Sequence, residues 1–127
     1  MLLAKGQKIL IVDDERRTAD TLATIFTIAG YEARATYSAE EALEILADWP
    51  PALIILDVVL PKMSGIDLAI AQAGRRPSCQ ILLFSGNPDT AQLARAAAQA
   101  GHPFDILEKP VHPDLMLQKV SRLLSVN

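Results

Sequence analysis

The sequence predicts an α/β fold, because short apolar segments alternate five times with longer segments of helical period. Several of the short segments lack polar alternation, as expected of parallel strands that are covered on both faces. Right-handed crossovers between parallel strands place helices on both faces of the sheet. The chain of 127 residues therefore predicts one doubly wound (βα)5 domain over residues 1–127, with a core from about residue 7 to residue 125.

Five apolar segments are the strand candidates. They are residues 8–12, 31–35, 53–56, 80–84 and 105–107. The carboxyl ends of parallel strands meet at one edge of a sheet, so functional side chains are expected just after these segments.

The first two helices are predicted by apolar side chains spaced three and four residues apart. The first stripe consists of Ala19, Leu22, Ala23, Phe26 and Ala29. Gly30 follows it and can end the helix in a left-handed conformation. The second stripe consists of Ala42, Ile45, Leu46 and Trp49. Ser38 and Glu41 form a capping-box pattern at the start of this helix, and the prolines after Trp49 force it to stop.

The remaining three helices follow from the same spacing and from helix propensity. The third stripe consists of Ile66, Ala69, Ile70 and Ala73, and Gly74 is expected to end it. The alanine-rich segment 89–100 favours a helix that ends at Gly101. The last stripe consists of Met116, Val120, Leu123 and Leu124.

Composition narrows the function classes. The net charge of −3 gives no basic footprint, and the Arg16-Arg17 and Arg75-Arg76 pairs are isolated, so no direct nucleic-acid contact is expected. No apolar run is long enough for a membrane span and no signal-like apolar region precedes Asp13, which predicts no membrane partner and a cytoplasmic location. Cys79 adjoins an apolar segment and is interpreted as a buried, unreactive thiol.

Four groups of polar residues lie at the expected strand ends: Asp13-Asp14-Glu15, Asp57, Ser85 and Lys109. Taken singly, each has an ordinary structural explanation. The aspartates could cap a helix or begin a loop. Ser85 could start a turn, and Lys109 could be a solvated loop lysine.

Taken together, these residues form one chemical unit. They offer carboxylates for a hard divalent cation, a carboxylate nucleophile, a hydroxyl donor and a cation for phosphate oxygens. Crowded carboxylates repel one another, and a bound Mg²⁺ offsets that repulsion. The sequence therefore predicts a Mg²⁺-dependent phosphoryl site, with Mg²⁺ as the cofactor.

Three segments carry a resemblance to a known family: ILIVDDE at residues 9–15, LIILD at residues 53–57, and Lys109-Pro110. They resemble the signature segments of bacterial response-regulator receiver domains, which act in two-component and phosphorelay signalling. The LPKMSG segment at residues 60–65 is similar to the family's loop after the acceptor aspartate. The resemblance covers nearly the whole chain and implies a parallel sheet of strand order 2-1-3-4-5.

The resemblance also implies roles for single residues. Asp57 would be the phosphoacceptor, and Lys109 and Ser85 would hold the transferred oxygens. Asp14, Asp57 and the backbone carbonyl of Val59 would coordinate Mg²⁺, with Asp13 contributing through water. The phosphoryl group would come from a histidine kinase, a histidine phosphotransfer protein or a small phosphodonor.

Signalling would follow from the site. Movement of Ser85 toward the phosphoryl group would change the surface around the fourth helix. A downstream protein would then bind the face formed by the fourth helix, the fifth strand and the fifth helix. The Lys109-Pro110 bond resembles a family site for a cis peptide, so Pro110 is the expected cis-proline. The chain would act as a stand-alone receiver or as an excised piece of a larger protein, catalysing its own phosphorylation and dephosphorylation without being an enzyme in the usual sense.

The chain departs from the family pattern near the switch. Ile106 stands where many members have an aromatic switch residue, and packing in the core is its favoured role. Gly86 stands where a small residue such as alanine is common, and it adds backbone freedom.

Two further departures lie where hydrolytic water would approach. They are Val59 and Asn87, each two residues after a residue of the site. The apolar Val59 side chain cannot orient water, which predicts slow loss of the phosphoryl group.

Three alternatives remain beside the phosphoacceptor. A degenerate receiver would bind its partner without phosphorylation, which Ile106 and the altered segment after Ser85 would permit. An aspartyl-phosphate phosphohydrolase would need a substrate pocket or cap for which no residues remain. A dinucleotide-binding domain is disfavoured because Asp13-Asp14-Glu15 replaces the glycine-rich phosphate loop.

Overall fold

The computed structural model describes residues 6–86, 88–101 and 104–125 and confirms the α/β prediction. Five parallel strands form one sheet of order β2-β1-β3-β4-β5. The strands are β1 (Lys8–Val12), β2 (Glu32–Thr36), β3 (Leu53–Asp57), β4 (Gln80–Ser85) and β5 (Asp105–Glu108). The helices are α1 (Arg16–Ile28), α2 (Ala39–Leu46), α3 (Gly65–Arg75), α4 (Pro88–Gln99) and α5 (Pro113–Ser125).

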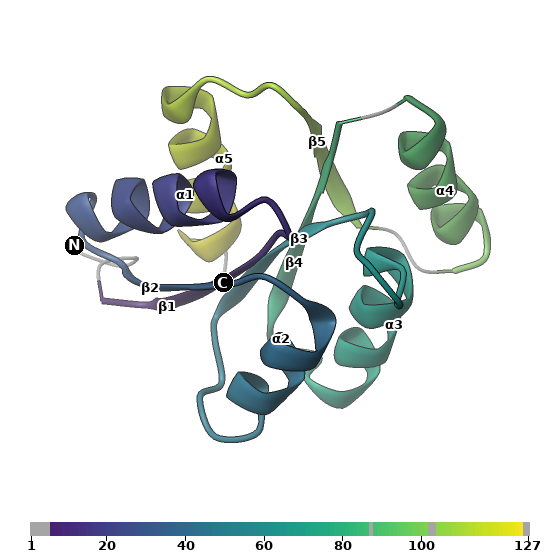
Figure 1. The fold of residues 1–127 in the computed structure, drawn as a ribbon, viewed down its shortest axis with the longest axis horizontal. Helices are drawn as coiled ribbons and strands as arrows, with labels where there is room; N and C mark the ends of the chain where they lie inside the picture. The colour runs from purple at the N-terminus through teal and green to yellow at the C-terminus, as the bar shows by residue number, and fades with distance from the viewer. Residues whose placement is uncertain (1–5, 87, 102–103, 126–127) are drawn as a thin grey trace.

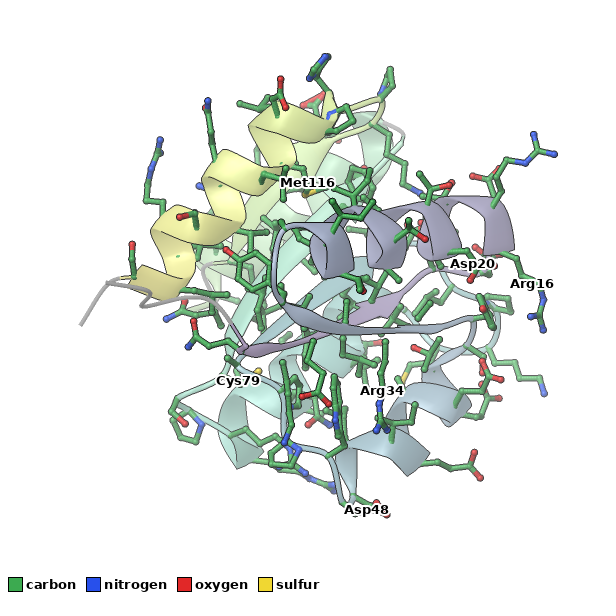
Figure 2. All side chains as sticks on the ribbon, turned by 90° about the vertical axis from the view of Figure 1, so that its left-hand side faces the viewer. Arg16, Asp20, Arg34, Asp48, Cys79 and Met116 are labelled. Atoms are coloured by element: carbon green, nitrogen blue, oxygen red, sulfur yellow. The ribbon has the colours of Figure 1, made fainter. Side chains whose placement is uncertain are left out.

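Helices cover both faces of the sheet (Figure 1). One face packs against α2 and α3 through a cluster that includes Leu10, Ile54 and Leu83. The other face packs against α1 and α5, where Figure 2 labels Met116, and this cluster includes Ile55 and Leu82. Alternate residues of a strand point to opposite faces, so the three central strands must be apolar throughout to serve both layers.

The first helix ends as predicted. Gly30 has φ +104°, and its N–H donates to the carbonyl of Thr27 at 3.1 Å. The Tyr31 N–H donates to the carbonyl of Phe26 at 3.0 Å, which completes a Schellman motif. Because Tyr31 closes the helix in this way, β2 begins at Glu32, and the predicted start at residue 31 is one residue early.

The capping box of α2 differs by one residue from the ideal pattern. The Ser38 Oγ accepts the Glu41 N–H at 3.1 Å, as predicted. The Glu41 carboxylate reaches back to the N–H of Tyr37 at 2.8 Å, one residue before the cap. The helix stops at Leu46, and the Trp49 backbone N–H donates to the Ile45 carbonyl at 2.9 Å. The Trp49 side chain is buried in the core cluster.

The predicted end of α3 at Gly74 is wrong, because the helix continues to Arg75. Gly74 does not take a left-handed conformation among the described residues. The Arg76 N–H still donates to the Gln72 carbonyl at 2.7 Å, and its guanidinium donates to the Leu46 carbonyl of α2. Pro77 follows Arg76, and the residue before a proline is disfavoured in the helical conformation, so Arg76 leaves the helix with φ −134° and α3 ends at Arg75. By contrast, Gly101 follows α4 with φ +97°, as predicted.

Within residues 6–86, 88–101 and 104–125, no helix has the length and apolarity needed to cross a bilayer.

Candidate phosphoryl and metal site

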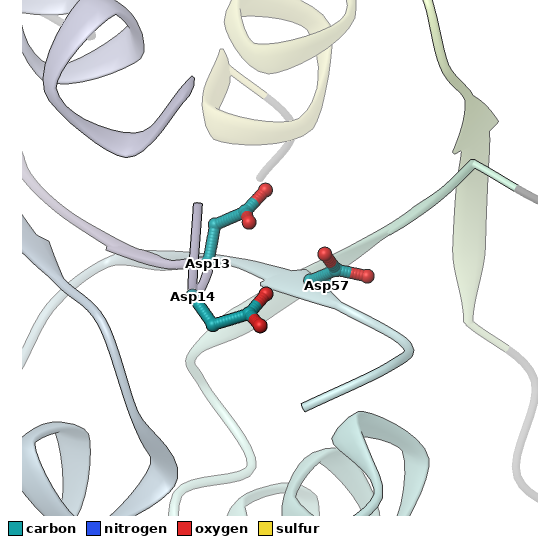
Figure 3. Close-up of side chains that lie close together, drawn as sticks. All are labelled: Asp13, Asp14 and Asp57. Atoms are coloured by element: carbon teal, nitrogen blue, oxygen red, sulfur yellow. The ribbon is translucent and has the colours of Figure 1, made fainter. Parts of the chain in front are cut away.

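The carboxyl edge of the sheet brings together three aspartates (Figure 3). Asp13 and Asp14 follow β1, and Asp57 ends β3, the strand next to β1 in the sheet. One carboxylate oxygen from each residue lies within 4.8 Å of the others. Asp13 and Asp57 are buried, whereas Asp14 is exposed. The convergence expected from the strand ends is therefore present in the folded chain.

Lys109 completes the cluster from the loop after β5. Its Nζ donates to Asp13 Oδ2 at 2.9 Å and to Asp57 Oδ2 at 3.0 Å. The Lys109 N–H also donates to the Ser85 carbonyl at 2.6 Å, which fixes the lysine backbone to the end of β4. The Lys109–Pro110 peptide bond is cis.

The second oxygens of the buried aspartates accept backbone hydrogen bonds. Asp13 Oδ1 accepts the N–H of Glu15 at 2.9 Å, and Asp57 Oδ1 accepts the N–H of Val59 at 3.0 Å. Asp13 therefore stabilises the turn before α1 but does not cap that helix, whose N-cap is Glu15 and has no side-chain cap bond. The other carboxylate oxygen of Asp13 accepts from Lys109. The two carboxylate oxygens of Asp13 thus accept from different partners.

The surroundings of the site shift the pKa values of both Asp57 and Lys109. Burial is the largest influence on the Asp57 carboxyl and, with the nearby Asp13 charge, raises its pKa, against the lowering effects of the Val59 N–H and Lys109. Burial lowers the pKa of Lys109, but its bonds to Asp13 and Asp57 outweigh that effect and raise it above the ordinary value. The lysine is therefore firmly charged, while desolvation still disfavours the ionised form of Asp57.

The donor chemistry of this cluster fits Mg²⁺. Carboxylate oxygens are the hard ligands that this ion prefers. Lys109 pairs with two of the three clustered carboxylates, and the described residues show no other ion pair to them, so negative charge remains to be neutralised.

Two other predicted site residues lie at or near this edge. Ser85 is the last residue of β4 and is 1% exposed. Ile106 lies within β5 and packs partly buried against the α2–α3 side of the core, in keeping with its predicted packing role. The Val59 side chain is 56% exposed, and Asn87 lies outside the described residues.

Two residues of the site were missed in the sequence. Gly65 begins α3, and a Cβ built on it would lie 1.9 Å from the backbone carbonyl oxygen of Asp57. Phe84 lies on β4 with its ring centroid 4.9 Å from Lys109 Nζ. A glycine at the start of a helix is only a weak sequence signal for the role of Gly65. No local pattern signals Phe84, because its partner Lys109 lies in the loop after β5.

A broad hollow adjoins the site, with a volume of about 510 Å³. It lies between α1 and the loop from β5 to α5, and Phe84, Gly86 and Lys109 contribute to its wall.

The comparison with protein families gives a decisive match. The model of the response regulator receiver domain matches residues 9–121. The chain belongs to the response-regulator receiver family. It is therefore a receiver domain of two-component signalling, as its resemblance implied.

Solved receiver structures share this architecture. The receiver domain of NtrX from Brucella abortus is 30% identical, with a TM-score of 0.84 and coverage of 94% of this chain and 99% of that one. A putative response regulator from Chloroflexus aurantiacus is 31% identical, with a TM-score of 0.83 and coverage of 96% and 100%.

Curated relatives are longer than this chain. The DNA-binding transcriptional regulator NtrC of Azospirillum brasilense is 34% identical over 119 residues, which are 94% of this chain and 24% of that protein. Response regulator MprA of Mycobacterium tuberculosis is 26% identical, with coverage of 92% and 50%. The chain thus spans half or less of the length of these relatives.

Proposed function

We propose that this receiver domain accepts a phosphoryl group on Asp57 and uses Mg²⁺ as its cofactor. The observation that carries the proposal is the convergence of Lys109 Nζ on Asp13 Oδ2 at 2.9 Å and on Asp57 Oδ2 at 3.0 Å. A buried carboxylate beside a fixed cation can act as a nucleophile whose developing charge is stabilised in place. The proposed donor is a histidine kinase or a histidine phosphotransfer protein.

Four residues would serve the metal. Asp14, Asp57 and the backbone carbonyl of Val59 would hold Mg²⁺ directly, and Asp13 would hold it through water. This assignment is supported by the spacing of the three carboxylates, whose ligand atoms lie within 4.8 Å of one another. When bound, Mg²⁺ supplies positive charge for the phosphoryl oxygens.

The transfer itself would be an in-line displacement. One carboxylate oxygen of Asp57 attacks phosphorus, so a P–O bond forms while the P–N bond to the donor histidine breaks. The electron pair of that bond leaves with the imidazole nitrogen. Lys109 then donates to the phosphoryl oxygens in place of the free carboxylate, and the Ser85 hydroxyl donates to another of them.

Loss of the phosphoryl group would occur at the same atoms. Water attacks phosphorus, the acyl P–O bond breaks, and the Asp57 carboxylate leaves. The exposed Val59 side chain has no hydrogen-bonding group with which to orient that water. A Val59→Asn variant should lose its phosphoryl group about fivefold faster, as expected for one added hydrogen bond. Equal or slower decay in this variant, followed by mass spectrometry, would refute the idea.

The signal would leave through the face formed by α4, β5 and α5. Ser85 joins the site to the segment before α4, and α5 presents Leu115, which is 51% exposed. We propose that a downstream protein binds this face and that the receiver domain itself makes no nucleic-acid contact. A Ser85→Ala variant that keeps full phosphorylation-dependent partner binding would argue against this route.

Intact mass after incubation with Mg²⁺ and a small acyl-phosphate donor tests the central proposal. The native protein should gain one phosphoryl group, and the Asp57→Asn variant and a metal-free sample should gain none. Asp48→Asn is the matched control, because Asp48 is an exposed aspartate after α2 that lies outside the three-carboxylate cluster and is labelled in Figure 2. If the folded native protein binds Mg²⁺ but gains no mass, a phosphorylation-independent interaction module becomes the better assignment.

A further inference from the structure

Phe84 is placed beside the proposed phosphoacceptor by the sheet. Its Cα is the register partner of Asp57 on the neighbouring strand, and its carbonyl accepts the N–H of Val58 at 3.1 Å. Its side chain belongs to the cluster under α1 and α5 and is 5% exposed. The ring is thus fixed by both the strand and the core.

This ring contacts the lysine of the site. Lys109 Nζ lies 4.9 Å from the Phe84 ring centroid while it donates to Asp13 and Asp57. An ammonium over an aromatic face is attracted by the ring's quadrupole, and the attraction grows as water is excluded. The Lys109 side chain is only 24% exposed, so this contact is partly shielded from solvent.

An aromatic face suits a cation that must change partners. The ring has no lone pair on its face that would bind an N–H in a fixed direction, so it holds the ammonium in place and leaves its donors available. A polar side chain at the same place would compete with the phosphoryl oxygens for those donors.

We propose that Phe84 is a positioning residue that holds Lys109 for phosphoryl chemistry at Asp57. The inference rests on the proposed function, since it concerns the same site. It differs from simple core packing, because it requires an aromatic face and not only apolar volume at this position.

The test compares variants that keep or remove the face. Phe84→Tyr keeps an aromatic ring, whereas Phe84→Leu and Phe84→Met fill the space without one. Phe26→Leu is the matched control, because Phe26 is fully buried in the same cluster but packs edge-on against Tyr31, with the ring centroids 5.9 Å apart. Urea unfolding of each protein measures the general cost of losing an aromatic side chain.

Two readouts follow the lysine. The first is the rate of phosphorylation by a small acyl phosphate at saturating Mg²⁺. This rate should fall about 2- to 30-fold in the Phe84→Leu and Phe84→Met variants, and it should stay within about twofold in Phe84→Tyr. The second is acetylation of the Lys109 amine in metal-free protein, followed by peptide mass mapping, which should be at least about twofold faster without the ring.

Two results with the Phe84 variants would each overturn the proposal: equal phosphorylation rates in Phe84→Met and Phe84→Tyr, or unchanged acetylation of Lys109 in all variants. A matching loss of rate in Phe26→Leu would also overturn it, because the effect would then come from general destabilisation. If the native protein takes up no phosphoryl group, the proposed function fails, and the acetylation rates still decide whether Phe84 holds Lys109.

Discussion

At the carboxyl ends of the strands, buried charges meet: Asp13 is 2% exposed, Asp57 is 7% exposed, and both accept hydrogen bonds from Lys109. At the amino ends of the same strands, backbone groups bond one another instead. The Ala52 N–H donates to the Lys8 carbonyl at 2.8 Å, and the Gln80 N–H donates to the Ala52 carbonyl at 2.9 Å.

Both ends have surface hollows, so shape alone does not distinguish them. The hollow at the amino end has a volume of about 460 Å³ and is lined by Gly6, Gln7, Lys8, Pro50, Pro51, Ala52 and Ser78. Within the described parts of the chain, only the carboxyl end gathers three potential metal-binding side chains. Backbone groups are paired at both ends, so the difference lies in the buried carboxylates of the carboxyl end. Burial raises the pKa of Asp57, so its ionised form opposes folding.

The two glycines of α3 give the strongest test, because one of them packs against the Asp57 backbone at the carboxyl edge and the other does not. A Cβ at Gly65 would meet the Asp57 carbonyl oxygen at 1.9 Å, whereas a Cβ at Gly74 would meet nothing within 4 Å. Gly65→Ala should therefore lower the free energy of unfolding by about 1–3 kcal/mol and weaken Mg²⁺ binding, because the Asp57–Val58 backbone must move. Gly74→Ala should raise it by up to about 1 kcal/mol, through helix propensity alone.

Urea unfolding and Mg²⁺ titration of both variants measure these effects. A Gly65→Ala protein with native stability and native Mg²⁺ affinity would show that the carboxyl edge is not tightly packed around Asp57.

The cost of the buried carboxylate is tested by Asp57→Asn. Because burial raises the pKa of Asp57 in the folded chain, its ionised form costs folding free energy at pH values above that pKa. The metal-free variant should therefore unfold at a higher temperature than the native protein at pH 7. The advantage should disappear as the pH falls below 3.8, the ordinary value, where the carboxyl is protonated in both states.

Mg²⁺ should reverse this order. At 100 times its dissociation constant, the ion should stabilise the native protein by about 2.7 kcal/mol and the variant by much less. Thermal unfolding with and without Mg²⁺ measures both changes. The control is a buffer that contains a chelator and no added divalent cation. A variant less stable than the metal-free native protein would show that the Asp57–Lys109 pair stabilises the fold.

The thiol of Cys79, which lies just before β4, tests whether the amino end of the sheet is chemically unreactive. Burial raises the pKa of its thiol from 9.0 to about 11, against a smaller lowering effect of Arg76. At pH 8 its thiolate fraction, and hence its alkylation by iodoacetamide, should be about 100-fold lower in the folded than in the unfolded chain. Mass spectrometry of alkylated samples gives both rates, and similar rates would mean that this end of the sheet opens readily.

Much of the fold could be predicted from residues close together in the chain. The predicted strand at residues 8–12 agrees with β1, and Gly30 and Gly101 end their helices because a local φ decides the chain reversal. The prediction failed at Gly74, because the helix continues to Arg75 and ends before Arg76, the residue that precedes Pro77. A glycine decides a helix end only where it takes the left-handed conformation, which Gly30 and Gly101 do and Gly74 does not.

The site divides in the same way. The sequence by itself determined which residues end each strand, and hence that Asp13, Asp57 and Lys109 share one edge of the sheet, because parallel strands align their carboxyl ends. Only the tertiary structure decided that Lys109 bonds Asp13 across 96 positions of sequence, that Phe84 lies under its ammonium, and that α3 needs a glycine against Asp57. Those contacts depend on how strands and helices pack at distances of a few ångströms, and residue spacing along the chain carries no such information.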